Sequence, residues 1–571
     1  MSRNHRNRLW RSGLAVSAAL AVTAGVAGAA PDAKSAATAP KLSLIAASGS
    51  VTLQRYEGEP GEPSGVYLDL GTYVSAEGGP LEFKVTRTSY NDPVVARQII
   101  RTGKKVSTKT LPAGMVKDFS GLQSFLQITL TDSAGKAVVN RKEAFCPNNA
   151  SGRIRPDAPA TSKYPQSCPT NPFTLGSVWG LEKGWAANTY QGYYSTPVDV
   201  PAGVYTAKVS VAKPYRDLLG MPNESRTLKV TVLPGEAPPP EVPGPPAAGT
   251  RGAHSGHSGH SGHGRHGGPA RPVDGLGHAN LRGHGIDTPA PPALPYALKK
   301  AGLAAAAAGD GPGRTDGSRS RPALKPAAQR PADRAGVPAN VPKPDLRALP
   351  AWDIFISGGA VGEVPGRDHL AFGSTTWNAG PAPLVVDGFR KPGKDLMDAY
   401  QYFHDASGKQ VGYAPTGTME WDPREGHMHW HFTDFAAYRL LKADKKEVVR
   451  SDKEAFCLVN TDAVDYTVKN ANWHPFSTDL GSACGEQNAL SVRQALDVGS
   501  GDTYSGYLPG QSFDITGVPN GTYYIQVVAN PDKKLHESDL TNNVSLRKVV
   551  LGGKPGARTV TAPPHGLVDS R

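Results

Sequence analysis

The chain has 571 residues, which is enough for two or more domains, and a formal net charge of +12. Apolar residues make up only 38% of it, whereas Gly and Pro number 65 and 51, so we expect a long segment without a packed core. The basic residues form no stripe interleaved with aromatic side chains, which argues against nucleic acid as a partner.

The first thirty residues have the three parts of an export signal. A basic head is followed by an apolar run at residues 14–26 and by the small residues Ala27, Gly28 and Ala29, where a signal peptidase would cleave. The apolar run is too short to span a bilayer, and no other stretch of the sequence comes close to doing so. We therefore expect a secreted, extracellular protein with a signal peptide at residues 1–30 and no membrane partner.

Two parts of the chain, residues 31–235 and 342–553, carry the same landmarks in the same order. For example, the sequence Lys-Glu-Ala-Phe-Cys at residues 142–146 recurs at residues 453–457. Both parts alternate in the manner of β-strands, with turn signals between the runs. We predict an all-β chain with two antiparallel β-sandwich-like domains related by duplication. Chance similarity between two unrelated β-sandwiches is the alternative.

The four cysteines fall into two pairs, one in each of these parts. In an exported protein they should be oxidised. The simplest pairing joins Cys146 to Cys168 and Cys457 to Cys484, because the members of each pair are close in sequence. The duplication supports this pairing, since each copy then holds one disulfide.

Residues 236–341 are predicted to be a disordered linker, and residues 554–571 a flexible tail. The linker is rich in Pro, Gly, Ala, Ser and Arg, and it buries too little apolar surface to offset its chain entropy. Within it, five histidines recur at every third residue from His254 to His266. Such imidazoles can bind Cu(II), Ni(II) or Zn(II) loosely, and a merely polar low-complexity linker explains them equally well.

Three histidines alternate in the second part of the chain, at His427, His429 and His431. On a strand, residues i, i+2 and i+4 share one face, so this spacing places three imidazoles on the same side. Three neutral imidazoles suit Cu(II) or Zn(II) and leave further coordination positions open for water, oxygen or substrate. The pattern therefore predicts a metal site without choosing the metal.

Five motifs between residues 344 and 551 resemble landmarks of the lysyl oxidases, in the order that the family has them. They are the histidine segment with the Asp-Phe pair and the tyrosine that follow it, and the segments at residues 453–458, 502–504, 510–516 and 537–543. The chain is similar to a secreted, bacterial member of that family. Animal members carry a further histidine where this chain has Arg424, and more disulfides than four cysteines can form. These departures leave the choice of substrate open.

The resemblance implies a copper- and quinone-dependent amine oxidase. His427, His429 and His431 would hold copper, and Lys453 and Tyr504 would be joined as lysine tyrosylquinone. Copper and molecular oxygen would oxidise the phenol to a quinone, to which the lysine adds. The enzyme would convert a primary amine or peptidyl lysine to an aldehyde, with release of hydrogen peroxide and ammonia. The motifs do not identify the base that takes the substrate proton.

Hard oxygen ligands of the kind that Ca²⁺ prefers gather near the end of the second part. In the family such residues join an Asp-Leu pair at the domain entrance. The resemblance thus gives a candidate calcium site made of Asp345, Leu346, Glu537, Asp539, Asn542 and Asn543. An ordinary Asn-rich polar loop is the alternative.

The first part of the chain keeps Lys142 and Tyr190 at the places that correspond to Lys453 and Tyr504. It contains no histidine from residue 31 to residue 235, so we interpret it as a degenerate copy without a copper site. The rival interpretation of the whole chain is a non-catalytic extracellular copper-binding protein in which no quinone forms. An adhesion protein built from two sandwiches is a more remote alternative.

Overall fold

The computed structural model describes residues 39–565, apart from one long gap and several short ones. The gaps are residues 57–63, 104, 150, 192–194, 236–329, 332–335, 359–362, 392, 424–428, 434, 452, 454, 474–483, 486, 507 and 509. The predicted export signal and most of the predicted linker lie outside the described residues. Within the described residues, no helical segment has the length and apolar content needed to cross a bilayer.

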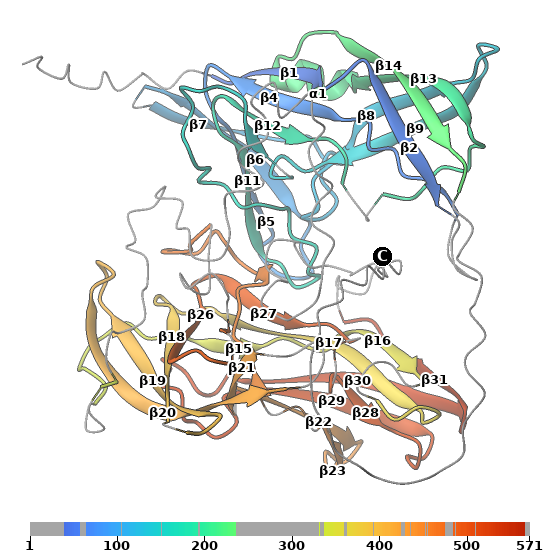
Figure 1. Ribbon diagram of the computed structural model, residues 1–571. Helices are drawn as coiled ribbons and strands as arrows, with labels where there is room; N and C mark the ends of the chain where they lie inside the picture. Colours follow the sequence, from blue (N-terminus) through green and yellow to red (C-terminus); the bar gives the residue numbers. More distant parts are fainter. Residues whose placement is uncertain are drawn as a thin grey trace, which may run out of the picture. The chain divides into compact units, whose positions relative to one another are not determined.

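The N-terminal β region, residues 39–235, forms three sheets and contains the helix α1 (Lys213–Leu219) (Figure 1). The first sheet has the order β1 (Lys41–Ala46), β4 (Thr72–Glu77), β12 (Trp185–Asn188), β10 (Gly152–Arg153). The second has the order β11 (Gly176–Leu181), β5 (Leu81–Thr86), β6 (Val95–Thr102), β7 (Lys105–Thr110). The third has the order β3 (Gly65–Val66), β2 (Ser50–Tyr56), β14 (Ser225–Leu233), β13 (Gly203–Val211), β8 (Leu122–Thr131), β9 (Ala137–Phe145).

The C-terminal β region also forms three sheets (Figure 1). The first has the order β15 (Leu346–Ala348), β17 (His369–Asn378), β27 (Ser500–Tyr504), β25 (Asp462–Ala463), with β16 (Trp352–Ser357) and β28 (Ser512–Asp514) also paired to β17. The second has the order β24 (Ala455–Phe456), β21 (His429–Thr433), β20 (Gln410–Asp422), β19 (Leu396–His404), β18 (Leu384–Arg390), β26 (Ser491–Leu496). The third has the order β23 (Glu447–Arg450), β22 (Ala436–Lys442), β29 (Gly521–Ala529), β30 (Val544–Lys554), β31 (Ala557–Thr561).

The strand orders of the two regions correspond. The order β1-β4-β12-β10 matches β15-β17-β27-β25, and β11-β5-β6-β7 matches β26-β18-β19-β20. Beyond β20, the second C-terminal sheet continues with β21 and β24. These strands have no counterpart in the described part of the second N-terminal sheet, which ends at β7. The predicted all-β class is confirmed. Every strand pair in the described part of the chain is antiparallel except β2 with β14, which run parallel.

The added strand β21 shows the predicted alternation of side chains. Trp430 and Phe432 are fully buried in the C-terminal hydrophobic core. Burial of each ring contributes on the order of 2 kcal/mol, which fixes which face of the strand turns inward. Because successive side chains point to opposite faces, His429 and His431 lie together on the other face.

Both predicted disulfides are confirmed. One joins Cys146 to Cys168, and the other joins Cys457 to Cys484. The carbonyl oxygen of Cys484 accepts a hydrogen bond from the backbone N–H of Trp430 at 3.0 Å. The second disulfide therefore ties the segment that follows Lys453 to the histidine strand.

Residues 557–561 differ from their predicted place in a flexible tail. They form β31, which pairs with β30 from Val550↔Thr561 to Lys554↔Ala557. The run Ala-Arg-Thr-Val-Thr is rich in β-branched residues, and a turn at Gly556 lets it fold back on the preceding strand. The prediction of a tail from residue 554 was therefore wrong over this strand.

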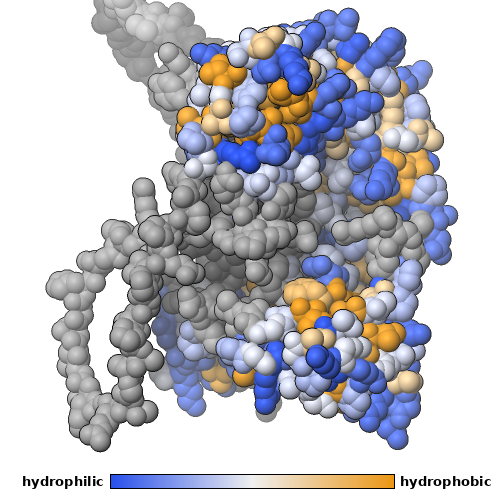
Figure 2. Space-filling model, turned by 90° about the vertical axis from the view of Figure 1, so that its right-hand side faces the viewer, coloured by the Kyte–Doolittle hydropathy of each residue, from blue (hydrophilic) through white to orange (hydrophobic). Residues whose placement is uncertain are grey.

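Exposed apolar side chains are scattered over the described surface. The face drawn in Figure 2 carries several separate orange patches among blue and pale residues. Leu490, with 81% of its surface exposed, is the most accessible large apolar residue in the described part of the chain. Scattered residues of this kind are normal on a folded protein and do not by themselves indicate a partner.

Backbone hydrogen bonds join the segment 171–176 to the segment 463–466. The Leu175 N–H donates to the Val464 carbonyl at 2.7 Å, and the Tyr466 N–H donates to the Gly176 carbonyl at 2.9 Å. A Cβ atom on Gly176 would lie 2.2 Å from Oδ1 of Asp465, so this close approach requires glycine.

Asp462, at the start of β25, is a buried carboxyl group beside this contact. Burial raises the pKa of Asp462 to about 6, although hydrogen bonds from Thr503, Asn171 and Thr461 act in the opposite direction. The folded state therefore holds a proton that the unfolded chain releases near its ordinary pKa of 3.8. This contribution to stability is present in full below that value and is lost as the pH rises through about 6.

We predict that Asp462→Asn removes this dependence on pH. Relative to the variant, the free energy of unfolding of the parent should fall by about 2 to 3 kcal/mol between pH ~4 and pH ~7. Urea denaturation of both proteins across this pH range measures the difference between their free energies of unfolding. The other titrating groups are common to both proteins, so their contributions cancel in this difference. Parallel curves for the two proteins would contradict the prediction.

Candidate active site

Lys453 and Tyr504, distant in sequence, meet inside the C-terminal region. The Nζ atom of Lys453 lies over the Tyr504 ring, 4.6 Å from its centroid, and 5.1 Å from the centroid of the Phe456 ring. Lys453 is 4% exposed and Tyr504 is 3% exposed. The structure therefore brings together the two residues that the sequence nominated for the cofactor, in a place with little access to water.

The Tyr504 ring is held by the segment that follows Lys453. Its hydroxyl group donates a hydrogen bond to the Cys457 carbonyl at 2.7 Å, and the Phe456 ring meets it edge-on at 5.1 Å. On the other side, β27 pairs with β17, where Ser374 is opposite Tyr504. The ring position is thus set by one hydrogen bond, one aromatic contact and the register of a buried strand.

Lys453 is positioned by two neighbours. Its backbone N–H donates to Oγ of Ser451 at 3.2 Å, and the Ser451 hydroxyl donates to the Gly510 carbonyl at 2.8 Å. Gly510 has a φ of +78°, and a Cβ atom there would lie 3.3 Å from the Cβ atom of Lys453. Glycine at residue 510 therefore allows both the left-handed turn and the approach of the lysine.

Burial raises the pKa of the Tyr504 phenol well above its ordinary value, and the nearby Asp502 and Tyr438 add to this effect. The phenol therefore stays protonated although the Lys453 amine lies over its ring. A divalent metal ion close to the hydroxyl group would promote loss of the proton. The electrostatics of the site therefore suit a neighbouring metal.

His429 and His431 lie side by side on β21, 6% and 2% exposed. Their Nε2 atoms are 2.8 Å apart and their ring centroids are 4.5 Å apart. The third predicted ligand, His427, lies outside the described residues. Within the described residues, no group of three or more His, Cys, Asp or Glu side chains is arranged to hold a metal ion.

Asp422, which the sequence analysis missed, lies 3.3 Å from Nδ1 of His431 through its Oδ2 atom. A carboxylate on one ring nitrogen fixes the tautomer and leaves the lone pair on the other nitrogen for a metal. The facing Nε2 atoms of His429 and His431 are then the available donors, and this donor type suits Cu(II) or Zn(II). The residue pair present is therefore compatible with the expected copper. The sequence signal for Asp422 was its position, as an acidic residue at the end of the strand that precedes the histidine segment.

Gln494 links the histidine strand to the lysine segment. Its Nε2 atom donates to the Trp430 carbonyl at 2.7 Å, and its Oε1 atom accepts from the Leu458 N–H at 3.1 Å. The strands β21 and β24 also pair directly, with Phe432 opposite Phe456. The backbone that carries the imidazoles and the backbone that carries Lys453 are thus fixed to each other.

Asp502 is a second residue that the sequence analysis missed. It lies two residues before Tyr504 on β27, so both side chains point to the same face of the strand. Burial raises the pKa of the Asp502 carboxyl group well above its ordinary value, while the Val459 N–H and the Lys453 charge act in the opposite direction. The sequence signal was an aspartate at an inward position of a strand that is otherwise buried.

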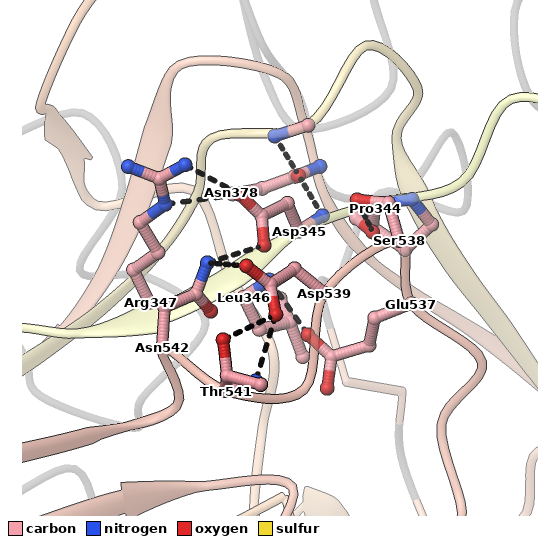
Figure 3. A network of polar contacts seen from close by, with 11 residues as sticks. Pro344, Asp345, Leu346, Arg347, Asn378, Glu537, Ser538, Asp539, Thr541 and Asn542 are labelled. Atoms are coloured by element: carbon pink, nitrogen blue, oxygen red, sulfur yellow. Dashed lines mark hydrogen bonds and ion pairs between the residues drawn. The ribbon is translucent and has the colours of Figure 1, made fainter.

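The six residues proposed to bind calcium also gather, as Figure 3 shows for five of them. Asn542 donates from Nδ2 to Oδ1 of Asp345 at 2.9 Å and to Oδ2 of Asp539 at 3.3 Å. The Leu346 N–H donates to Oε2 of Glu537 at 2.7 Å. The structure thus joins the Asp-Leu pair to the acidic segment near the C-terminus.

The same cluster keeps oxygen atoms that have no hydrogen-bond donor. Asn543 donates from Nδ2 to Oε1 of Glu537 at 2.7 Å, but Oδ1 of Asn543 and Oδ1 of Asn542 are buried without a described partner. The Arg347 guanidinium group donates two hydrogen bonds to Oδ2 of Asp345, at 2.9 and 2.7 Å (Figure 3). Unpaired amide oxygens beside carboxylates are the donor type that suits Ca²⁺.

The N-terminal counterparts of the central pair are placed differently. Lys142 lies on β9, and its side chain is exposed, unlike that of Lys453. Tyr190 follows β12 and is half-buried. The N-terminal region therefore lacks the enclosed lysine that the C-terminal region has.

Comparison with known proteins finds relatives of the region that holds these residues. The lysyl oxidase family model matches residues 403–559. Lysyl oxidase homolog 3B of Danio rerio is 34% identical over 128 residues, which is 22% of this chain and 14% of that one. Lysyl oxidase homolog 2 of Xenopus tropicalis is 31% identical over 137 residues, 24% of this chain and 16% of that one. Lysyl oxidase homolog 3 of Homo sapiens is 34% identical over 128 residues, 22% of this chain and 15% of that one.

The chain spans less than a fifth of the length of these curated relatives. The segment that the family model matches nevertheless contains His429 and His431 together with Lys453 and Tyr504. The chain therefore carries, over residues 403–559, a domain of the lysyl oxidase family.

Proposed function

We propose that this domain is a copper-dependent amine oxidase of a secreted, extracellular protein. It would convert primary amines, peptidyl lysine among them, to aldehydes, with molecular oxygen as the oxidant and hydrogen peroxide and ammonia as further products. Its cofactor would be lysine tyrosylquinone, made from Lys453 and Tyr504. The observation that carries this proposal is the position of the buried Lys453 amine over the face of the Tyr504 ring.

The geometry suits the formation of a bond between these two residues. An amine adds to a quinone by approaching a ring carbon from above the ring plane, and the Lys453 amine already lies over the ring. Phe456 blocks an edge of the same ring, and burial keeps water from competing with the lysine. The flexible lysine stem has only a short distance to move.

His429 and His431 would hold the copper, together with His427, and Asp422 would orient His431. When bound, copper would supply, with molecular oxygen, the oxidation of the Tyr504 phenol, and the resulting quinone would accept electrons from the amine. The chain's own contribution is to hold the imidazoles and the lysine segment in register through Gln494.

We extend the proposal to the rest of the chain. Residues 342–553 would be the catalytic domain and residues 31–235 a degenerate copy of it without copper, joined by the linker at residues 236–341. The matching strand orders support the duplication, and the exposed Lys142 together with the missing histidine strand supports the loss of chemistry. The role of this copy is separate from the redox reaction.

Calcium would bind at the cluster around Asp345 and Glu537 and fasten the entrance of the domain to its C-terminal segment. The unpaired oxygens of Asn542 and Asn543 support this proposal. The ion would displace or share the Arg347 contact with Asp345, because both carry positive charge.

We predict a covalent bond between Lys453 and Tyr504 in copper-loaded, aerated protein. Mass spectrometry of a digest should show one joined peptide pair, and a primary amine should bleach the visible absorption that accompanies it. Tyr504→Phe lacks the phenol and should lose the colour while keeping copper. Lys453→Arg should lose the bond, because a guanidinium that stays protonated is a poor nucleophile.

The same experiment separates the proposal from its rival, a non-catalytic copper-binding protein. Under the rival, both variants would behave like the parent, since neither residue is a copper ligand. Linear peptides at both positions in copper-replete, aerated parent protein would end the amine oxidase proposal.

We predict a graded loss of copper at the histidine strand. A partner behind a ligand typically contributes about 10- to 100-fold to metal affinity, so Asp422→Asn should weaken copper binding by about that factor, and His429→Ala by at least ~100-fold. Both variants should keep their β-type circular dichroism, because an open catalytic site need not hold the fold together. His404→Ala, which changes another buried histidine on β19, is the control and should keep copper. Full copper occupancy in His429→Ala would refute the ligand assignment.

We predict that calcium stabilises the parent but not Glu537→Gln. At a calcium concentration of 100 times the dissociation constant, the gain in unfolding free energy should be about 2.7 kcal/mol. Thermal unfolding with and without calcium measures it, and Glu447→Gln, which alters an exposed carboxylate, serves as the control. An equal shift in parent and Glu537→Gln would place the ion elsewhere.

A further inference from the structure

The proposed reaction requires a base that takes a proton from the substrate carbon next to nitrogen. Among the described residues, the titratable side chains that act on Tyr504 or Asp502 are Lys453, Tyr438 and Asp462. With Asp502 itself, they are the candidates for this base. Lys453 is consumed in the cofactor. Tyr438 is held protonated by burial, which raises its pKa, and its hydroxyl accepts a hydrogen bond from Ser374 at 2.7 Å. Two carboxyl groups remain.

These two carboxyl groups differ in their hydrogen bonding. Asp462 interacts with the side chains of Thr503, Asn171 and Thr461. Asp502 is 1% exposed, and the Val459 N–H and the Tyr504 hydroxyl approach it, but neither of its oxygens has a well-aligned hydrogen bond within the part of the chain that the structure describes. A buried carboxyl group without a well-aligned hydrogen bond costs stability, and an active site is the usual place where such a cost is retained.

The position of Asp502 is suited to act on a substrate at Tyr504. Both side chains project from the same face of β27, and the Asp502 carboxylate lies beside the Tyr504 hydroxyl. An amine that condenses with the ring carries its α-carbon one bond beyond the nitrogen. A carboxylate beside a ring oxygen is therefore within reach of the hydrogen on that carbon, directly or through one water.

We propose that Asp502 is the catalytic base that removes the α-proton of the amine substrate, an inference that rests on the proposed amine oxidase function. The carbon–hydrogen bond of the amine breaks, the proton passes to an oxygen of Asp502, and the electron pair reduces the quinone by two electrons. Molecular oxygen takes up these electrons as hydrogen peroxide, and water releases the aldehyde and ammonia.

The surroundings make Asp502 a stronger base than an ordinary carboxylate. Burial raises its pKa, and the nearby negative charge of Asp462 raises it further. The Lys453 cation lowers it in the unmodified chain, but the lysine loses its ammonium group when it joins the ring. A base whose pKa approaches the working pH is the efficient kind for proton abstraction.

The test compares Asp502→Asn with the parent and with Asp462→Asn, all loaded with copper in air. Digest mass spectrometry reports the joined peptide pair, and phenylhydrazine reports the quinone carbonyl without any need for an α-proton. Anaerobic bleaching by butylamine, with and without deuterium on its α-carbon, then reports the proton transfer alone. Asp502→Asn should keep the joined peptides and the phenylhydrazine adduct, but bleach at least ~100-fold more slowly.

The pH dependence adds a result that a merely structural role would not give. In the parent, bleaching should speed up as the pH rises through the pKa of Asp502, since only the carboxylate accepts a proton. Asp462→Asn should keep this rise, and Asp502→Asn should lose it. Asp502→Glu retains a carboxylate and should recover part of the rate, with a primary deuterium isotope effect.

Two outcomes would overturn the assignment. One is an Asp502→Asn protein that carries the joined peptides and bleaches within about threefold of the parent. The other concerns both variants together: Asp502→Asn forms no joined peptides, whereas Asp502→Glu forms them but bleaches no faster than background. Asp502 would then act only in making the cofactor. If the parent itself lacks the joined peptides, the proposed function fails first and this inference falls with it.

Discussion

The hydrogen bond from the Tyr504 hydroxyl group to the Cys457 carbonyl sets the position of the ring on which the rest of the site depends. Cys457 is in turn bonded to Cys484, whose carbonyl accepts a hydrogen bond from Trp430 on the histidine strand. The tyrosine, the lysine segment and the imidazoles are therefore tied through one short covalent and hydrogen-bonded path. Burial strengthens each of these polar contacts, because few water molecules compete for the same groups.

A protein can keep a site of this kind only if the surrounding sheets fix it from several sides. The β17–β27 pairing, the added strands β21 and β24, and the Gln494 bridge each constrain a different part. The N-terminal region has matching strand orders but ends its second sheet at β7 in the described residues, and its Lys142 is exposed. The comparison indicates that the fold and the disulfide are shared by both regions, whereas the enclosed polar site occurs where the strands β21 and β24 are added.

The all-β class, the two disulfides and the face shared by His429 and His431 could be predicted from the sequence, because each follows from strand alternation or from cysteine spacing. The contact of Lys453 with Tyr504 could be expected only from family resemblance, since sequence separation carries no information about strand pairing. Asp422, Gln494 and Asp502 were missed for the same reason: a polar residue becomes informative only when its burial and its neighbours are known. The error over β31 arose because the strand has only five residues, too few to show a clear alternation, and follows a glycine-containing turn.

The central claim is that the chain already holds Lys453 and Tyr504 ready to react, so that copper and oxygen alone complete the cofactor. The most direct measurement is the visible absorption of purified, copper-free protein after stoichiometric copper is added in air. The absorption should rise as a first-order process whose rate does not depend on protein concentration, and it should not rise without oxygen. Stoichiometric copper binding without any absorption, in aerated protein that remains folded, would contradict the account.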